Sequence, residues 1–98
     1  MTTEEIIEYS KNFRMGLFGN KKGDGLCFAV SAPLCGALKF MGVNCRLGHF
    51  HVEGFDSFEE HYAIVVRETE LLDPTYDQIK AGNPQMFYGK IPENYIEI

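Results

Sequence analysis

The apolar residues of this chain change their spacing at Gly42, and that change limits the folds open to it. From Cys27 onward they recur at helical spacing, at Val30, Leu34, Leu38 and Met41. After Gly42 they alternate with polar residues, as in a half-buried strand, at Val43, Cys45, Leu47, Phe50 and Val52. We therefore expect Gly42 to end a helix as its C′ residue. A strand should follow over residues 44 to 53, in which Gly48 can mark a bulge.

Two features organise the chain before that point. Thr2 and Glu5 have the spacing of a capping box, and the apolar stripe that follows predicts a helix over residues 3 to 13. Residues 16–25 hold four glycines and read as a loop. Pro33 lies inside the second helical pattern. Either that helix begins near Cys27 and bends, or its regular part starts near Pro33.

The second half of the chain reads as a small antiparallel sheet. A turn at residues 54–57 precedes an apolar strand from His61 to Arg67. Residues 68–70 make a hairpin connection, and a third strand over 70–72 stops at Asp-Pro. A last strand is expected over residues 95–98. The prediction is a single α+β domain over residues 1–98, with an N-terminal helix and a Cys-bearing helix packed on the sheet.

Charge and cysteine content limit the partners and the cellular compartment that we expect for this chain. The formal net charge is −5, and the only basic pair is Lys21-Lys22, so nucleic acid is not an expected partner. No apolar run approaches the ~20 residues of a membrane span, and the acidic N-terminus does not resemble a signal peptide. Three cysteines without a Cys-x-x-Cys pair argue against a disulfide framework. We expect a cytoplasmic protein with reduced thiols and no membrane association.

Three residues carry the candidate chemistry. Cys27 heads the second helix, His61 opens a strand, and Asp73 closes the next one. A helix N-terminus or a neighbouring imidazolium lowers the pKa of a thiol, and a carboxylate on the other ring nitrogen fixes the imidazole tautomer. If residues 61–67 and 70–72 form a hairpin, His61 and Asp73 lie toward the same open end of the sheet. This arrangement predicts a cysteine nucleophile with its base.

The same residues resemble a known superfamily. Gly25-x-Cys27, the strand His61-Tyr62-Ala63-Ile64-Val65 and the run Leu72-Asp73-Pro74-Thr75 are similar to the transglutaminase-like cysteine proteases, over roughly residues 23 to 78. The resemblance implies a papain-like fold. It also implies that Cys27 is the nucleophile, His61 the general base and Asp73 the carboxylate that orients it. The implied activity is acyl transfer through a Cys27 thioester, by a peptidase, amidase or transglutaminase, on a peptide or protein substrate and without a cofactor.

The chain departs from that superfamily in two respects. The usual domains are longer, which leaves 98 residues little chain to build substrate pockets. The glutamine that serves the papain oxyanion hole has no counterpart upstream of Cys27. Backbone N–H groups of Cys27 and of the glycine-rich loop would have to replace it.

Two other classes of function fit parts of the sequence. A papain-like domain without activity can serve as a protein-binding or inhibitory module, and the acidic chain suits a basic partner. His49 and His51, with His61 or Cys45, have the residue types for zinc. We favour the simpler interpretation, in which the two histidines face solvent and alternate with a core-facing Phe50, and we expect no metal.

Overall fold

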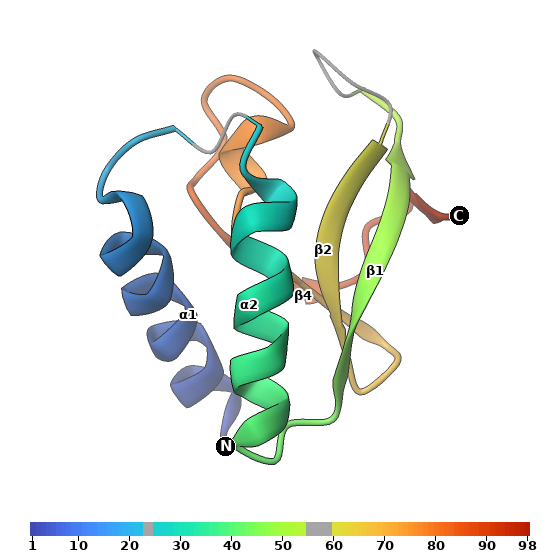
Figure 1. Ribbon diagram of the computed structural model, residues 1–98. Helices are drawn as coiled ribbons and strands as arrows, with labels where there is room; N and C mark the ends of the chain where they lie inside the picture. The colour runs from blue at the N-terminus through green and yellow to red at the C-terminus, as the bar shows by residue number, and fades with distance from the viewer. Residues whose placement is uncertain (23–24, 55–59) are drawn as a thin grey trace.

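The computed structural model describes residues 1–22, 25–54 and 60–98 (Figure 1). Its elements are, in chain order, α1 (Thr3–Phe18), α2 (Cys27–Phe40), β1 (Cys45–Val52), β2 (Glu60–Val66), β3 (Glu70–Asp73), the 3₁₀ helix η1 (Tyr76–Gln78), β4 (Phe87–Lys90) and β5 (Tyr95–Glu97). The strands form one antiparallel sheet in the order β4-β3-β2-β1-β5. The predicted α+β class, with helices on an antiparallel sheet, is confirmed. Part of the predicted turn at 54–57 lies outside the described residues.

Helix α1 is longer than the predicted 3–13. Its capping box forms as expected, with Glu5 N–H donating to Thr2 Oγ1 and Thr2 N–H to Glu5 Oε1. The prediction of a loop from residue 16 is wrong, because the helix continues to Phe18 and ends at Gly19, where φ is +62°. A glycine inside a helix costs about 1 kcal/mol. Tertiary contacts of the last turns of α1 outweigh that loss: buried Arg14 binds both carboxylate oxygens of Asp77, far along the chain, and Phe18 lies one turn beyond it with its ring centroid 5.0 Å from the guanidinium.

Helix α2 begins at Cys27 and runs through Pro33. The first of the two predicted alternatives therefore holds for where the helix starts. The proline leaves the carbonyl of Ala29 without its helical donor, and Ala29 is exposed, so water can supply that hydrogen bond. At the other end, Val43 N–H donates to Leu38 O at 2.9 Å and Gly42 N–H donates to Lys39 O at 3.0 Å. These are the two bonds of a Schellman motif, with Gly42 at C′ as predicted.

The sheet is buried on both faces. Toward the helices lies a core of Ile6, Leu34, Cys35, Leu38, Val43, Cys45, Ile64, Val66 and Leu72. Behind the sheet lies a second one, made of Phe50, Val52, Ala63, Val65, Leu71, Ile79 and Tyr95. Figure 1 shows α2 between α1 and strands β1 and β2. Strand β2 contributes side chains to both cores, and this packing on two sides fixes the position of the first residues of the strand. Neither helix, within the part of the chain that the structure describes, is long and apolar enough to cross a membrane.

Two features of the sheet differ from the sequence-based expectation. Gly48 lies opposite Ala63 in an unbroken β1–β2 register, so the bulge that it can mark does not form. The Phe50 ring fills the space beside it instead: a Cβ at position 48 would lie 2.6 Å from that ring. Strand β4 and helix η1 were not predicted. The four residues of β4 do not alternate, and the strand exists because β3 offers it an edge.

The close approach of Phe50 to Gly48 generates a stability prediction. Gly48→Ala should lower the free energy of unfolding by about 1–3 kcal/mol, because the new methyl group must displace a ring that is itself packed in the core. Gly36→Ala is the matched control, since nothing lies within 4 Å of a Cβ at that helical position. It should stabilise the fold by about 0.5–1 kcal/mol. Urea denaturation measures both, and a Gly48→Ala variant as stable as the parent would contradict this packing.

Candidate active site

The β2–β3 hairpin brings His61 and Asp73 together. Ile64 pairs with Leu72, which places Asp73 opposite Ala63, on the sheet face that also carries His61 two residues away. Diagonal neighbours of this kind are within reach of long side chains. His61 Nε2 lies 2.8 Å from Asp73 Oδ2, and both side chains are completely buried. Their predicted proximity at one end of the sheet is therefore found.

The Asp73 carboxylate has further partners. Its Oδ2 also accepts a hydrogen bond from the Tyr95 hydroxyl at 2.5 Å, and its Oδ1 accepts from the Thr75 backbone N–H at 3.0 Å. Burial and the charge of Asp73 raise the pKa of Tyr95, so the phenol stays protonated and remains a donor. Sequence reasoning missed Tyr95 as a member of the site. Its only signal was its place in the expected last strand, far from Asp73 in sequence.

The His61 side chain also forms a hydrogen bond with the Cys27 side chain. Since Asp73 holds Nε2, the Nδ1 nitrogen is the one left to face the thiol. Burial opposes the imidazolium form, but hydrogen bonds to Asp73 and Cys27 and the charges of both groups raise the pKa of His61 to about 9. The two ionisations depend on each other, so the pair titrates as a unit. The environment therefore favours a charged imidazole at neutral pH.

The position of Cys27 depends on a part of β2 that has no neighbouring strand on one side. Strand β3 pairs with β2 only from Ile64 to Val66, which leaves the backbone of Tyr62 open on that side. Helix α2 takes up this edge: the buried Ser31 Oγ donates to Tyr62 O at 3.3 Å. The N-terminal end of α2 consequently lies at the same end of the molecule as the start of β2 (Figure 1).

The thiol of Cys27 is half-buried and its pKa is lowered. Burial works against the thiolate, but it is outweighed by hydrogen bonds from the His61 side chain and from the backbone of Tyr62 and Phe28, together with the charge on His61. A lowered thiol pKa beside a raised imidazole pKa shifts the balance toward a thiolate–imidazolium pair. This is the chemical state of an activated cysteine nucleophile.

The other two cysteines are in a different environment. Cys35 and Cys45 are almost completely buried between α2 and β1, and their sulfur atoms lie 3.8 Å apart, in hydrogen-bond contact and without a disulfide. Burial and the neighbouring Cys35 raise the pKa of Cys45 to about 12. Cys45 is therefore a packing residue with little thiolate at neutral pH.

The histidines of β1 do not join the site. Phe50 is buried, whereas His49 and His51 are partly exposed, in line with the favoured interpretation. His49 pairs with Tyr62 and stacks on its ring, with centroids 4.5 Å apart, while His61 pairs with Phe50 and so faces the other side of the sheet. Among residues 1–22, 25–54 and 60–98, no group of three or more His, Cys, Asp or Glu side chains could hold a metal ion.

Comparison with known proteins adds no relative. No family model, no curated protein and no solved structure matches the chain. The site must therefore be judged on its own geometry.

The contrast among the three thiols is testable by alkylation. Cys27 should react first with iodoacetamide in the native protein, because its thiol is partly exposed and has a lowered pKa, whereas Cys35 and Cys45 are buried. Cys35 and Cys45 should react only on unfolding. Peptide mapping by mass spectrometry after limiting exposure to the reagent reports the order. Modification of Cys35 or Cys45 ahead of Cys27 would contradict the assignment of the nucleophile.

The contact between Tyr95 and Asp73 generates a second prediction. Tyr95→Phe should lower the free energy of unfolding by about 1.5–3 kcal/mol, since it removes a hydrogen bond to a buried carboxylate. Tyr88→Phe makes the same chemical change where the phenol donates to the partly exposed Glu70 at 3.0 Å. Water can replace that donor, and the loss should be smaller, about 0.5–1.5 kcal/mol. Equal losses in chemical denaturation would show that the Asp73 partner is not special.

Proposed function

We propose that this chain is a cysteine-dependent acyl-transfer enzyme of papain-like or transglutaminase-like type, acting on peptide or protein substrates. The observation that carries the proposal is the buried His61–Asp73 hydrogen bond at 2.8 Å, with the Cys27 thiol on the other side of the same imidazole. The resemblance of the motifs around these residues to the transglutaminase-like superfamily supports the same roles.

The chemistry follows from the charge state of the pair. The Cys27 thiolate attacks the carbonyl carbon of an amide, and the negative charge moves to the carbonyl oxygen. The His61 imidazolium gives its proton to the leaving amine as the C–N bond breaks, which leaves a thioester on Cys27. A water molecule or a second amine then gives a proton to His61 and attacks the thioester, and Cys27 leaves as the thiolate. Asp73 holds the imidazole in one orientation throughout.

The first turn of α2 is the natural site for the developing oxyanion. Helical N–H groups in the first turn have no partner within the helix, and the helix dipole adds to their field. Cys27 is the first residue of α2, and its N-cap residue, Leu26, makes no side-chain cap. The Cys27 N–H is thus suited to the role that a glutamine plays in papain-like enzymes. The other predicted contributor, the glycine-rich loop, includes Gly23 and Asp24, which lie outside the described residues.

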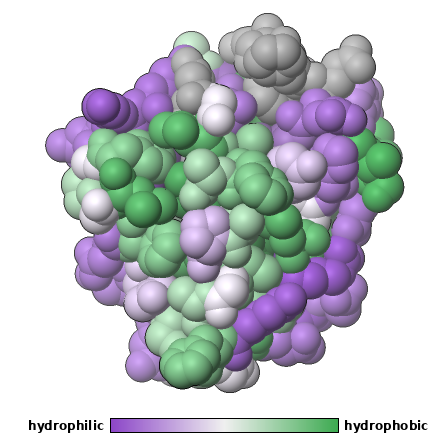
Figure 2. Space-filling view, in the orientation of Figure 1, coloured by the Kyte–Doolittle hydropathy of each residue, from purple (hydrophilic) through white to green (hydrophobic). Residues whose placement is uncertain are grey.

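One observation favours the alternative, an inactive domain that binds another protein. The outer face of α2 is apolar: Phe40 is 92% exposed and Phe28 54% exposed. Figure 2 shows apolar side chains gathered over the face of the molecule on which α2 lies. Exposed apolar groups in such a cluster mark interaction surfaces. The exposed apolar groups would explain the binding of a partner protein, but they do not explain why Cys27, His61 and Asp73 lie together.

The pH dependence of Cys27 alkylation tests the proposed function. Because the folded environment lowers the thiol pKa, the rate should stay high as the pH falls below about 8.5, where an ordinary thiol becomes protonated. Asp73→Asn should keep the fold but favour the wrong imidazole tautomer. The midpoint of the profile should then rise by at least about one unit, equivalent to ~1.4 kcal/mol of lost ion-pair stabilisation.

Two controls make this measurement decisive. Cys27→Ala should abolish labelling by an acyl electrophile at neutral pH, while Cys35→Ala should not. A wild-type profile centred at the value of a free thiol would remove the enzyme proposal and favour the binding module. A lowered thiol pKa that survives Asp73→Asn would leave Cys27 and His61 as a dyad.

A further inference from the structure

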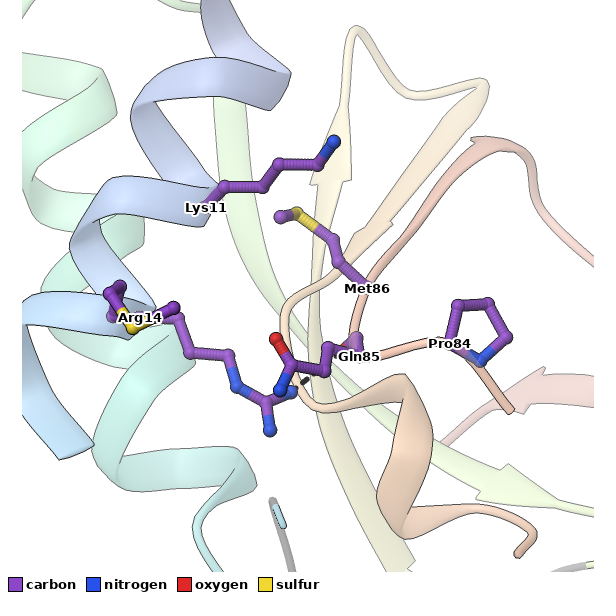
Figure 3. Close-up of a pocket in the computed structure, with 6 residues that line it drawn as sticks. Lys11, Arg14, Pro84, Gln85 and Met86 are labelled. Carbon is purple, nitrogen blue, oxygen red and sulfur yellow. Dashed lines mark hydrogen bonds between the residues drawn. The ribbon is translucent and has the colours of Figure 1, made fainter. Parts of the chain in front are cut away.

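Arg14 is the largest fully buried side chain in the described structure, with 2% of its surface exposed. It projects from α1, and Figure 3 shows its guanidinium reaching Gln85 at the wall of a cavity of about 380 Å³. Nη1 and Nη2 bond the two carboxylate oxygens of Asp77 at 2.9 and 2.8 Å. This bidentate ion pair neutralises the buried charge. It uses only part of the hydrogen-bonding capacity of the guanidinium.

The remaining bonds of Arg14 go to backbone carbonyls of three segments. Nη1 lies 2.9 Å from Pro74 O and 2.7 Å from Gln85 O, and because its two hydrogens also serve Asp77 Oδ1, one of them is shared between two oxygens. Nη2 donates to Lys21 O at 2.8 Å. Pro74 directly follows Asp73, and Lys21 precedes Cys27 by six residues. One side chain therefore ties the turn that carries the carboxylate of the site to the segment that leads into its nucleophile.

We propose that Arg14 is a positioning residue for the candidate active site. Its planar guanidinium binds the Pro74 carbonyl and the Lys21 carbonyl at once, and it thereby keeps Asp73 in place beside His61. This inference rests on the thiol site of the proposed function and extends it to a residue on α1. A planar guanidinium suits the task because its donors point in fixed directions. Lysine carries the same charge, but its single nitrogen offers three donors at one point and cannot reach all three segments at once.

The proposal predicts the effect of Arg14→Lys on His61. The ammonium retains a partner for Asp77, so the buried carboxylate keeps a counter-charge. With the Pro74 carbonyl released, the turn after Asp73 is held less firmly, so the hydrogen bond from His61 to Asp73 weakens and the imidazolium loses part of its support. The pKa of His61 should fall by at least one unit from its raised value of about 9, a tenfold loss of proton affinity, and the alkylation midpoint of Cys27 should rise.

The experiment is an NMR titration of the His61 imidazole in parallel with Cys27 alkylation. Arg46→Lys is the matched control: Arg46 is likewise an ion-paired arginine, bound to the carboxylates of Glu68 and Glu97, but it lies on the exposed edge of the sheet away from His61. It should leave the His61 pKa unchanged. A folded Arg14→Lys chain with an unchanged His61 pKa would overturn the proposal and reduce Arg14 to a stabilising residue.

Two further arms keep the outcome clear. If Arg14→Lys does not fold, the double variant Arg14→Met with Asp77→Leu takes its place, because it leaves no unpaired buried charge. It removes the same carbonyl bonds and should lower the His61 pKa in the same direction. An ordinary Cys27 thiol in the wild type would end the proposed function, while the His61 titration would still decide on Arg14.

Discussion

The buried carboxylate of Asp73 is the constraint on which the site depends. A charge with no solvent exposure must be fully hydrogen-bonded, or it becomes neutral. Here the partners come from separate parts of the chain: His61 from β2, Tyr95 from β5 and the Thr75 backbone from the turn after β3. Strand β5 lies at the edge of the sheet beyond β1, so the carboxylate ties together strands that are not neighbours. Satisfying this one group therefore constrains the order of the strands.

A second buried ion pair, between Arg14 of α1 and Asp77, lies near the segments that carry the site. Arg14 and Asp77 neutralise each other, and the remaining donors of Arg14 hold irregular backbone that has no ladder or helix of its own. A chain of this length has a modest core, and its connecting segments need such polar anchors to keep one conformation. Buried ion pairs add little net stability, because desolvation offsets the attraction between the charges. Their geometric specificity is the more useful property here.

Local sequence rules were sufficient for the parts of the fold that depend on neighbours in the chain. The capping box at Thr2, the Schellman glycine at position 42 and the β2–β3 hairpin all follow from residues close in sequence, and the hairpin alone places His61 near Asp73. The continuation of α1 past Gly16 and the straight register at Gly48 could not be predicted in this way. They depend on contacts between distant parts of the chain: the ion pair of Arg14 with Asp77, and the packing of the Phe50 ring against Tyr95. Tyr95 was missed for the same reason, since nothing near it indicates a bond to a residue 22 positions earlier.

The position of Cys27 follows from what the sheet leaves unpaired. Strand β3 stops pairing at Ile64, because the chain turns away at Pro74, and the first residues of β2 are left with open backbone groups. An unpaired strand edge needs a cover. The first turns of α2 provide it, with Ser31 on the Tyr62 carbonyl and the thiol of Cys27 beside the Tyr62 backbone. The same mismatch in strand length that exposes this edge brings a helix N-terminus to the imidazole. Proximity of thiol and base is thus a consequence of satisfying the backbone, and the Asp73 network then decides which proton the imidazole keeps.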